Sequence, residues 1–247
     1  MMYISEEVKN QYLNLIEGLD HECGLSRAIV ETRYSDDLFY RHENEDGEKD
    51  MDQYLSNHNA WSAYGATRIV FGYDDDEYII KIQTNLDNDD FDYGAREVET
   101  YEAAVEAKLD KYFAGCALLF HYTFTWGSRS FRLPVYIMKR CNCSYDQISD
   151  DSYNYHYSKY CEESGRDGNE DETRDLFYDE YEENYDSTDG MLMYAMTTWN
   201  EDYEDWAPLY RFISDWQIND LHAGNWGYVD GRLVLTDYAG YGQLADR

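Results

Sequence analysis

Two aspartates and an asparagine near the end of the chain have the types and spacing that phosphoryl transfer requires. Asp220 lies five residues before Asn225 and seventeen before Asp237. This reaction needs a carboxylate that orients the attacking hydroxyl group, and oxygen ligands that hold Mg²⁺ against the phosphates. An Asp and an Asn on one loop can divide these tasks, and a second Asp supplies another metal ligand. Between them, Asp230-Gly231 predicts the turn of a β-hairpin.

A lysine upstream could supply a cation. Lys81 lies within the apolar run 78–82, which predicts a β-strand. An unpaired ammonium buried in such a strand is costly, so the lysine requires a partner or a ligand. By itself this residue has two interpretations, a phosphate ligand or an edge-strand lysine directed to solvent.

The elements that must position these residues are indicated by hydrophobic periodicity. Residues 1–60 are expected to be mainly helical, with Ser5 as an N-cap. Strands are expected over 67–71, 78–82, 116–125 and 131–140, the last two joined by a turn at 126–129. A helix is expected over 93–112, with an apolar stripe that consists of Val98, Tyr101, Val105 and Leu109.

The segment 144–190 is rich in Asp, Glu and Tyr and has little periodic apolar signal. It is interpreted as an ordered acidic insert, because its many rings can pack on the rest of the protein; disorder is the alternative. Helical character returns over 191–218, with Leu209, Phe212, Ile213 and Trp216 as the inward face.

Asp220-Leu-His-Ala-Gly-Asn225 resembles the catalytic loop of the protein-kinase-like superfamily, and Thr236-Asp-Tyr-Ala-Gly240 resembles the metal-binding motif that follows it. A His and a Gly before the Asn are similar to those of small-molecule phosphotransferases and of the compact protein kinases that bacteriophages make early in infection. The resemblance covers about residues 55–247. It implies an α+β, bilobal kinase-like fold, with a small antiparallel-sheet N-lobe and a reduced helical C-lobe that carries the acidic insert.

The resemblance also implies roles for the residues of the loop. Asp220 would be the catalytic base, and Asn225 and Asp237 would hold Mg²⁺. His222 is expected to orient the loop by hydrogen bonding. Lys81 would grip the α- and β-phosphates of ATP.

Three further positions follow from the same resemblance. The lysine should pair with a helix glutamate, for which Glu97 is preferred and Glu99 is the rival. The phosphate-covering loop is assigned to Ala60–Ile69, where Gly65 and Ala66 would approach the phosphates. Met138 lies in the strand that leads to the adenine-binding hinge.

The expected division of the chain has three parts: a helical N-terminal extension (1–54), a kinase-like N-lobe (55–140) and a reduced C-lobe (141–247). The C-lobe includes the insert (144–190) and a catalytic hairpin (218–240). The sequence departs from the family in two ways. The phosphate loop has a single glycine, and the chain ends ten residues after Asp237, before the helices that would form a peptide-substrate platform.

The net charge of −32 favours basic partners. Such a charge repels nucleic acids and anionic membranes, and no run of eighteen apolar residues predicts a membrane span. Solubility alone is the other explanation of the charge. Five cysteines without an export signal favour reduced thiols in the cytoplasm. Cys141-x-Cys143 has no second ligand pair at zinc-finger spacing.

Two hypotheses follow. The first is an ATP- and Mg²⁺-dependent protein kinase that phosphorylates Ser or Thr of basic host proteins, including nucleic-acid-binding ones. The second is a non-catalytic kinase-fold decoy, which mimics nucleic-acid charge and inhibits a host defence or transcription protein. A small-molecule substrate remains open, and the sequence leaves the oligomeric state undetermined.

Overall fold

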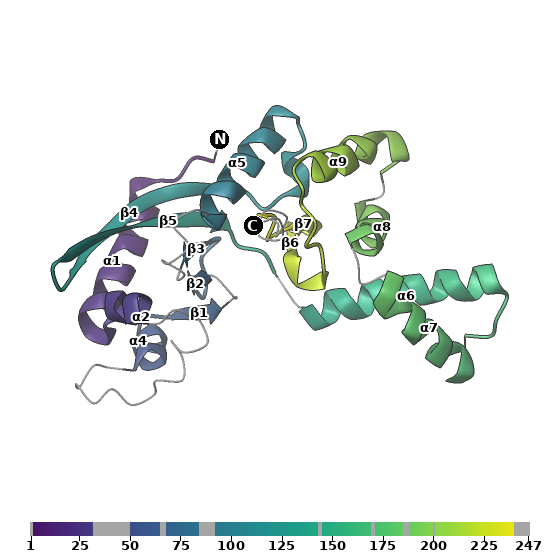
Figure 1. Ribbon diagram of the computed structural model, residues 1–247, viewed down its shortest axis with the longest axis horizontal. Coiled ribbons are helices and arrows are strands. Elements are labelled where there is room, and N and C mark those ends of the chain that lie inside the picture. The colour runs from purple at the N-terminus through teal and green to yellow at the C-terminus, as the bar shows by residue number, and fades with distance from the viewer. Residues whose placement is uncertain are drawn as a thin grey trace. The chain divides into compact units, whose positions relative to one another are not determined.

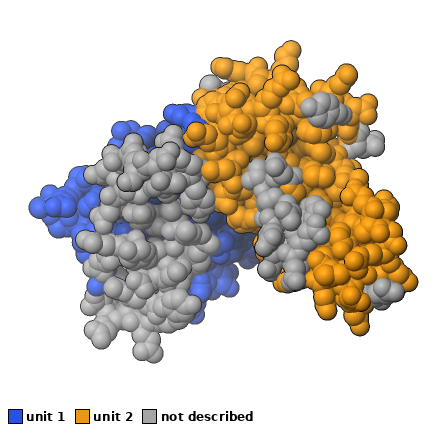
Figure 2. Space-filling view, turned by 45° about the vertical axis from the view of Figure 1, so that its right-hand side comes forward, with its two compact units in different colours: residues 1–99, 115–140 blue, residues 100–114, 141–247 orange. Residues whose placement is uncertain are grey.

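The computed structural model describes residues 2–31, 50–64, 68–83, 92–142, 145–168, 171–184, 188–199 and 201–239. The protein is a mixed α+β structure that divides into two compact units, coloured separately in Figure 2. Unit 1 comprises Met1–Glu99 and Gly115–Arg140, and unit 2 comprises Thr100–Ala114 and Cys141–Arg247.

Unit 1 is built around a five-stranded antiparallel sheet in the order β1-β2-β3-β5-β4 (Figure 1). Its strands are β1 (Ala60–Tyr64), β2 (Arg68–Tyr73), β3 (Tyr78–Gln83), β4 (Cys116–Trp126) and β5 (Arg129–Lys139). The four strands expected from periodicity are therefore present. Ala60–Tyr64, the first part of the segment assigned to the phosphate-covering loop, forms β1 and pairs with β2. This pairing satisfies the backbone polar groups of the segment.

One face of this sheet is covered by helices α1 (Glu6–Cys23), α2 (Leu25–Glu31) and α4 (Met51–Asn57). The predicted cap is present, since the Ser5 side chain accepts a hydrogen bond from Val8 N at 3.2 Å. Gly24 ends α1 in the left-handed conformation, with φ of 67°. The core between these helices and the sheet consists of buried apolar residues that include Tyr12, Ile16, Leu19, Ile69, Phe71, Ile80, Ile82, Val135 and Ile137.

Helix α5 (Tyr93–Glu106) follows β3, and its boundary and buried face both differ from the prediction. The helix ends before residue 112 because Lys108 takes a positive φ of 61°, and Leu109 N bonds back to Ala104 O. A 3₁₀ turn, η1 (Asp110–Tyr112), then follows. The buried residues of α5 are Tyr93, Gly94, Glu97, Thr100 and Ala104, whereas Val98, Tyr101 and Val105 of the predicted stripe are only half-buried.

Unit 2 contains the second half of α5, η1 and the elements after Arg140. These are α6 (Tyr145–Ser164), α7 (Asp171–Asn184), α8 (Thr188–Trp199), α9 (Tyr203–Asp215), η2 (Ala223–Asn225) and the hairpin strands β6 (Trp226–Val229) and β7 (Arg232–Leu235). The segment 191–218 thus forms two helices, with Leu209, Phe212 and Ile213 buried as predicted.

The described part of the acidic segment is ordered, as α6 and α7. Phe177 of α7 is fully buried and packs against the rings of Tyr153, Tyr157 and Tyr160 of α6. A few aromatic contacts therefore replace a continuous apolar stripe, which is why periodicity gave no helical signal. His156 fixes α6 to the start of α8, because its Nε2 lies 3.0 Å from Gly190 O.

In the described part of the chain, no helix is both long and apolar enough to cross a membrane. No disulfide bond joins the described cysteines, which are Cys23, Cys116, Cys141 and Cys161.

Candidate functional site

Lys81 lies at the centre of the sheet face opposite the α1–α2–α4 helices. In the register its neighbours are Val70 on β2 and Tyr136 on β5. Because side chains alternate along a strand, Lys81 and Tyr136 face away from the core residues Ile80, Ile82 and Ile137. The lysine is not on an edge strand, and its side chain is only 8% exposed.

Glu97 of α5 is the partner of this lysine. Lys81 Nζ lies 3.1 Å from Glu97 Oε1 and 3.2 Å from Oε2, and the glutamate side chain is 1% exposed. The rival residue, Glu99, is exposed. The predicted contact between Lys81 and Glu97 is therefore present, and it joins the central strand to the helix that follows it. A buried ammonium and a buried carboxylate stabilise each other only at such short range.

Arg68, which the sequence analysis did not identify, is a second cation at Glu97. Its Nη1 lies 2.8 Å from Glu97 Oε1, and its side chain is 9% exposed. The guanidinium also lies over the ring of Tyr93, 5.9 Å from its centroid. The available signal was an arginine that alternates with Ile69 and Phe71 in a strand pattern. Its partner depends on the strand register, which the sequence does not specify.

The first turn of α5 is fixed against β5. Asp92 Oδ1 accepts a hydrogen bond from Ala95 N at 3.0 Å, and Asp92 Oδ2 accepts one from Tyr136 Oη. Burial raises the pKa of Tyr136, and the hydrogen bond to Asp92 raises it further, so the phenol remains protonated as the donor. A side chain at Gly94 would lie 2.1 Å from the Tyr136 ring, so only glycine permits this close approach. These contacts hold Glu97 in position.

Of the other residues predicted for nucleotide binding, the structure describes Met138 but not Gly65 or Ala66. Met138 is buried at 1% exposure, two residues after Tyr136 on the same face of β5, and it pairs in register with Ile79 and Cys116. Gly65 and Ala66 lie outside the described residues, between β1 and β2. Their expected contact with phosphates stays a prediction.

In unit 2, the loop from Asp220 to Asn225 is held by its own side chains. Asn225 Nδ2 donates a hydrogen bond to Asp220 O, and Trp226 Nε1 donates one to Leu221 O at 3.2 Å. Asn225 is 8% exposed, whereas the Asp220 side chain is 31% exposed. The asparagine is therefore part of the loop's structure, and the aspartate carboxylate is accessible to solvent.

The hairpin after this loop brings Asp237 back to it. Asp230 and Gly231 both have positive φ, 52° and 80°, as a tight two-residue turn requires. Strands β6 and β7 pair from Trp226–Leu235 to Val229–Arg232, and Thr236 N then donates to Asn225 O at 2.9 Å. Asp237 thus directly follows Thr236 in the chain, and the backbone of Thr236 is hydrogen-bonded to Asn225.

The donor atoms of Asn225 and Asp237 fit magnesium. Because the Asn225 amide nitrogen is used in the loop, its carbonyl oxygen would be the ligand atom, and Asp237 would add carboxylate oxygens. Mg²⁺ is commonly held by one or two such protein ligands together with phosphate oxygens and water. Within the described residues, no group of three or more His, Cys, Asp or Glu side chains is placed to hold a metal ion.

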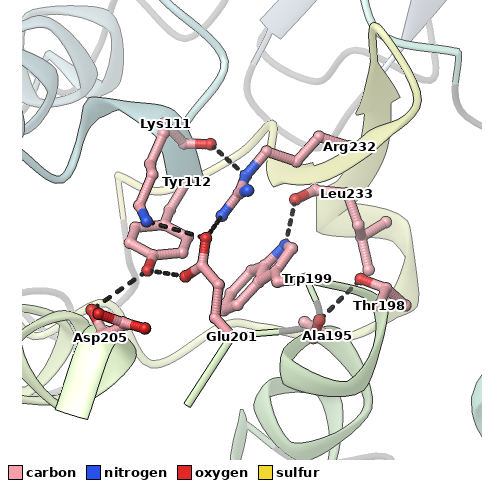
Figure 3. A network of polar contacts seen from close by, with 9 residues as sticks. All are labelled: Lys111, Tyr112, Ala195, Thr198, Trp199, Glu201, Asp205, Arg232 and Leu233. Atoms are coloured by element: carbon pink, nitrogen blue, oxygen red, sulfur yellow. Dashed lines mark hydrogen bonds and ion pairs between the residues drawn. The ribbon is translucent and has the colours of Figure 1, made fainter. Parts of the chain in front are cut away.

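A polar network fixes the hairpin to η1 and to the segment between α8 and α9 (Figure 3). Glu201 Oε1 lies 2.8 Å from Lys111 Nζ and 2.9 Å from Arg232 Nη2, and Tyr112 Oη donates to Glu201 Oε2. Arg232 Nε donates to Lys111 O at 3.0 Å. Trp199 Nε1 donates to Leu233 O at 2.8 Å. The strand that leads to Asp237 is therefore held along its length.

No protein-family description, curated protein or solved structure matches this chain.

Proposed function

We propose that this protein has a bilobal, protein-kinase-like fold, and that it transfers the γ-phosphoryl group of ATP to Ser or Thr hydroxyls of basic host proteins during bacteriophage infection. One observation carries the proposal: the buried pair of Lys81 on β3 and Glu97 on the next helix. In protein kinases a strand lysine that is paired with a helix glutamate contacts the nucleotide phosphates. A buried sheet lysine whose carboxylate partner is shared with a second cation is unusual for a purely structural element.

The loop and hairpin of unit 2 support the same proposal. Asp220 is accessible and can accept the proton of an attacking hydroxyl group. Asn225 and Asp237 provide the oxygen atoms that would hold Mg²⁺, which neutralises charge on the phosphates when it is bound. Lys81 would supply a cation for phosphate binding, and Asp220, Asn225 and Asp237 would supply a base and metal ligands; phosphoryl transfer requires groups of these types.

The distribution of charge supports a basic protein substrate. Residues 145–184 contain fourteen acidic and three basic residues, and the described acidic side chains of this segment are exposed. Complementary charge accelerates the association of a basic substrate and suppresses the binding of acidic ones. A small-molecule hydroxyl group is the alternative acceptor.

The test is phosphoryl transfer with γ-labelled ATP and Mg²⁺, in which the purified protein is incubated alone, with bacterial lysate and with small hydroxyl compounds. Wild-type protein should label basic proteins, and Asp220→Ala should reduce labelling at least 100-fold while it retains ATP binding. Lys81→Met should weaken ATP binding. Asp215→Ala, which changes an exposed aspartate five residues before the loop, is the matched control and should be fully active. Absence of both ATP binding and transfer would overturn the proposal.

A second candidate function is favoured by the acidic helices themselves. Exposed apolar side chains, Leu176 at 42% and Tyr178 at 53%, accompany the acidic residues of α7. This combination suits a decoy that captures a basic defence or transcription protein without catalysis. If the protein acts as such a decoy, the Asp220→Ala variant should inhibit the target protein as strongly as the wild-type protein does.

A further inference from the structure

His222 lies two residues after Asp220 and caps the short η2 turn. Its Nδ1 accepts a hydrogen bond from Gly224 N at 3.0 Å. A ring nitrogen that accepts a hydrogen bond carries no proton, so the proton of the neutral ring is on Nε2. The backbone of the loop thereby selects one tautomer of this histidine.

The protonated nitrogen of that tautomer is the one near the catalytic candidate. His222 Nε2 lies 3.7 Å from Asp220 Oδ1. This separation is longer than a hydrogen bond, but it is short enough for a donor to attract the carboxylate and for a small rotation to close the contact. Both side chains are partly exposed, at 45% for the histidine and 31% for the aspartate.

Gly224 makes this ring position possible. A Cβ atom at residue 224 would lie 2.8 Å from His222 Cε1, which is closer than real contacts allow, and 3.0 Å from His222 Nδ1, so the ring would have to move. The pattern Asp220-x-His222-x-Gly224 is therefore one unit, in which the glycine admits the ring and the ring nitrogen lies near the aspartate.

The shape of the loop has supports other than His222. Asn225 Nδ2 bonds to Asp220 O, Trp226 Nε1 bonds to Leu221 O, and Thr236 N bonds to Asn225 O. These bonds involve neither nitrogen of the imidazole. The loop backbone should consequently remain in place when the imidazole is replaced.

We propose that His222 is a positioning residue for the Asp220 carboxylate. In this arrangement a small rotation closes the 3.7 Å separation, so that Nε2–H donates to Oδ1 and fixes the carboxylate orientation. Oδ2 then accepts the hydrogen bond of the substrate hydroxyl group. The effect of this arrangement on catalysis rests on the proposed phosphoryl transfer. The contact between His222 and Asp220 is independent of that function.

Nuclear magnetic resonance of the full-length protein with ¹⁵N-labelled histidine tests the contact without any reaction. The His222 signals are identified by their loss in His222→Gln. We expect an unprotonated Nδ1 and a protonated Nε2 in the wild type. The Nε2 resonance should shift in Asp220→Asn and stay unchanged in the control Asp215→Asn. A proton on Nδ1, or no response to Asp220→Asn, would overturn the proposal.

Matched substitutions test the consequence for catalysis. His222→Asn keeps an acceptor near the position of Nδ1 but removes the Nε2 donor, and His222→Gln does the reverse. We expect His222→Asn to lower kcat about 10-fold with unchanged KM for ATP and unchanged Tm, and His222→Gln to recover most of that loss. Gly224→Ala should displace the ring and also lower kcat.

The outcomes separate the two proposals. Equal kcat in His222→Asn and wild type, or a loss that His222→Gln does not recover, would reject the positioning role while the kinase function stands. If wild-type protein transfers no phosphate to any acceptor, the proposed function fails, and the resonance measurement alone decides whether His222 contacts Asp220.

Discussion

Glu97 is shared by two buried cations, Lys81 and Arg68, and this sharing changes how much each cation contributes to the stability of the fold. Removal of one partner from a buried ion pair is strongly destabilising when it leaves the other charge uncompensated. Here loss of the lysine leaves Glu97 paired with Arg68 at 2.8 Å. The stability of the helix–sheet junction is therefore separable from the phosphate binding that is proposed for Lys81.

We predict that Lys81→Met lowers the free energy of unfolding by about 1 kcal/mol or less, whereas Glu97→Gln, which leaves two cations without this carboxylate, lowers it by about 3 kcal/mol or more. Urea denaturation of the two variants, of Arg68→Met and of the Lys81→Met/Arg68→Met double variant measures this. The double variant should lose more than the sum of the single losses. Equal losses in Lys81→Met and Glu97→Gln would contradict the prediction.

For individual residues, the sequence predicted a contact where the family motif includes both of the residues that form it. The resemblance to kinases implied that Lys81 pairs with a helix glutamate, and the preference for Glu97 over Glu99 agrees with the contact and with the exposure of Glu99. Arg68 could not be chosen, because its approach to Glu97 depends on the pairing of β2 with β3. The roles of Asp220, Asn225 and Asp237 stay predictions.

Among the elements, the β6–β7 hairpin positions Asp237, and Glu201 is its main polar anchor. Partial burial works to raise the pKa of Glu201, but hydrogen bonds from Lys111, Tyr112 and Arg232 outweigh it and lower the pKa to about 2. A carboxyl group whose pKa is lower in the folded state stabilises the protein above its unfolded pKa, near 4.5. That contribution is lost as the pH falls towards 2.

We predict that Glu201→Gln lowers the free energy of unfolding by about 2 kcal/mol at pH 7, because three charged or polar donors lose an ionised acceptor. The difference between wild type and variant should be constant above pH 5 and should shrink from pH 4.5 towards pH 2. Urea denaturation across this range measures it, with Asp230→Asn in the exposed hairpin turn as the control. A difference that does not change with pH would show that charge on Glu201 is unimportant.

Element prediction succeeded where apolar alternation was regular, as in β2, β3, β4 and β5. It failed where other interactions decided the structure. The buried face of α5 carries Glu97, Thr100 and Ala104, which no hydrophobic stripe reveals. Helices α6 and α7 are held together by rings around Phe177, so their scarcity of aliphatic residues concealed them.

Over the whole molecule, the charge of −32 is unevenly distributed along the chain, with fourteen acidic and three basic residues in 145–184. If α6 and α7 receive a basic partner, the charges on these helices matter more than equal charges elsewhere. If the charge serves solubility alone, its location is unimportant. A local substitution with a matched control therefore separates the two explanations.

We predict that neutralisation of three exposed residues of α6, by Asp150→Asn, Glu162→Gln and Glu163→Gln, weakens binding of a lysine-rich peptide about 10-fold in 50 mM salt. The same change in net charge in the β2–β3 turn of unit 1, by Asp74→Asn, Asp75→Asn and Glu77→Gln, should have little effect. Affinity of the wild type should fall steeply towards 1 M salt, because the screening length decreases from about 14 Å at 50 mM to about 3 Å. Fluorescence anisotropy of the labelled peptide measures all of these affinities. Equal weakening by both triple variants would assign the attraction to net charge alone, and the acidic helices would then have no specific partner.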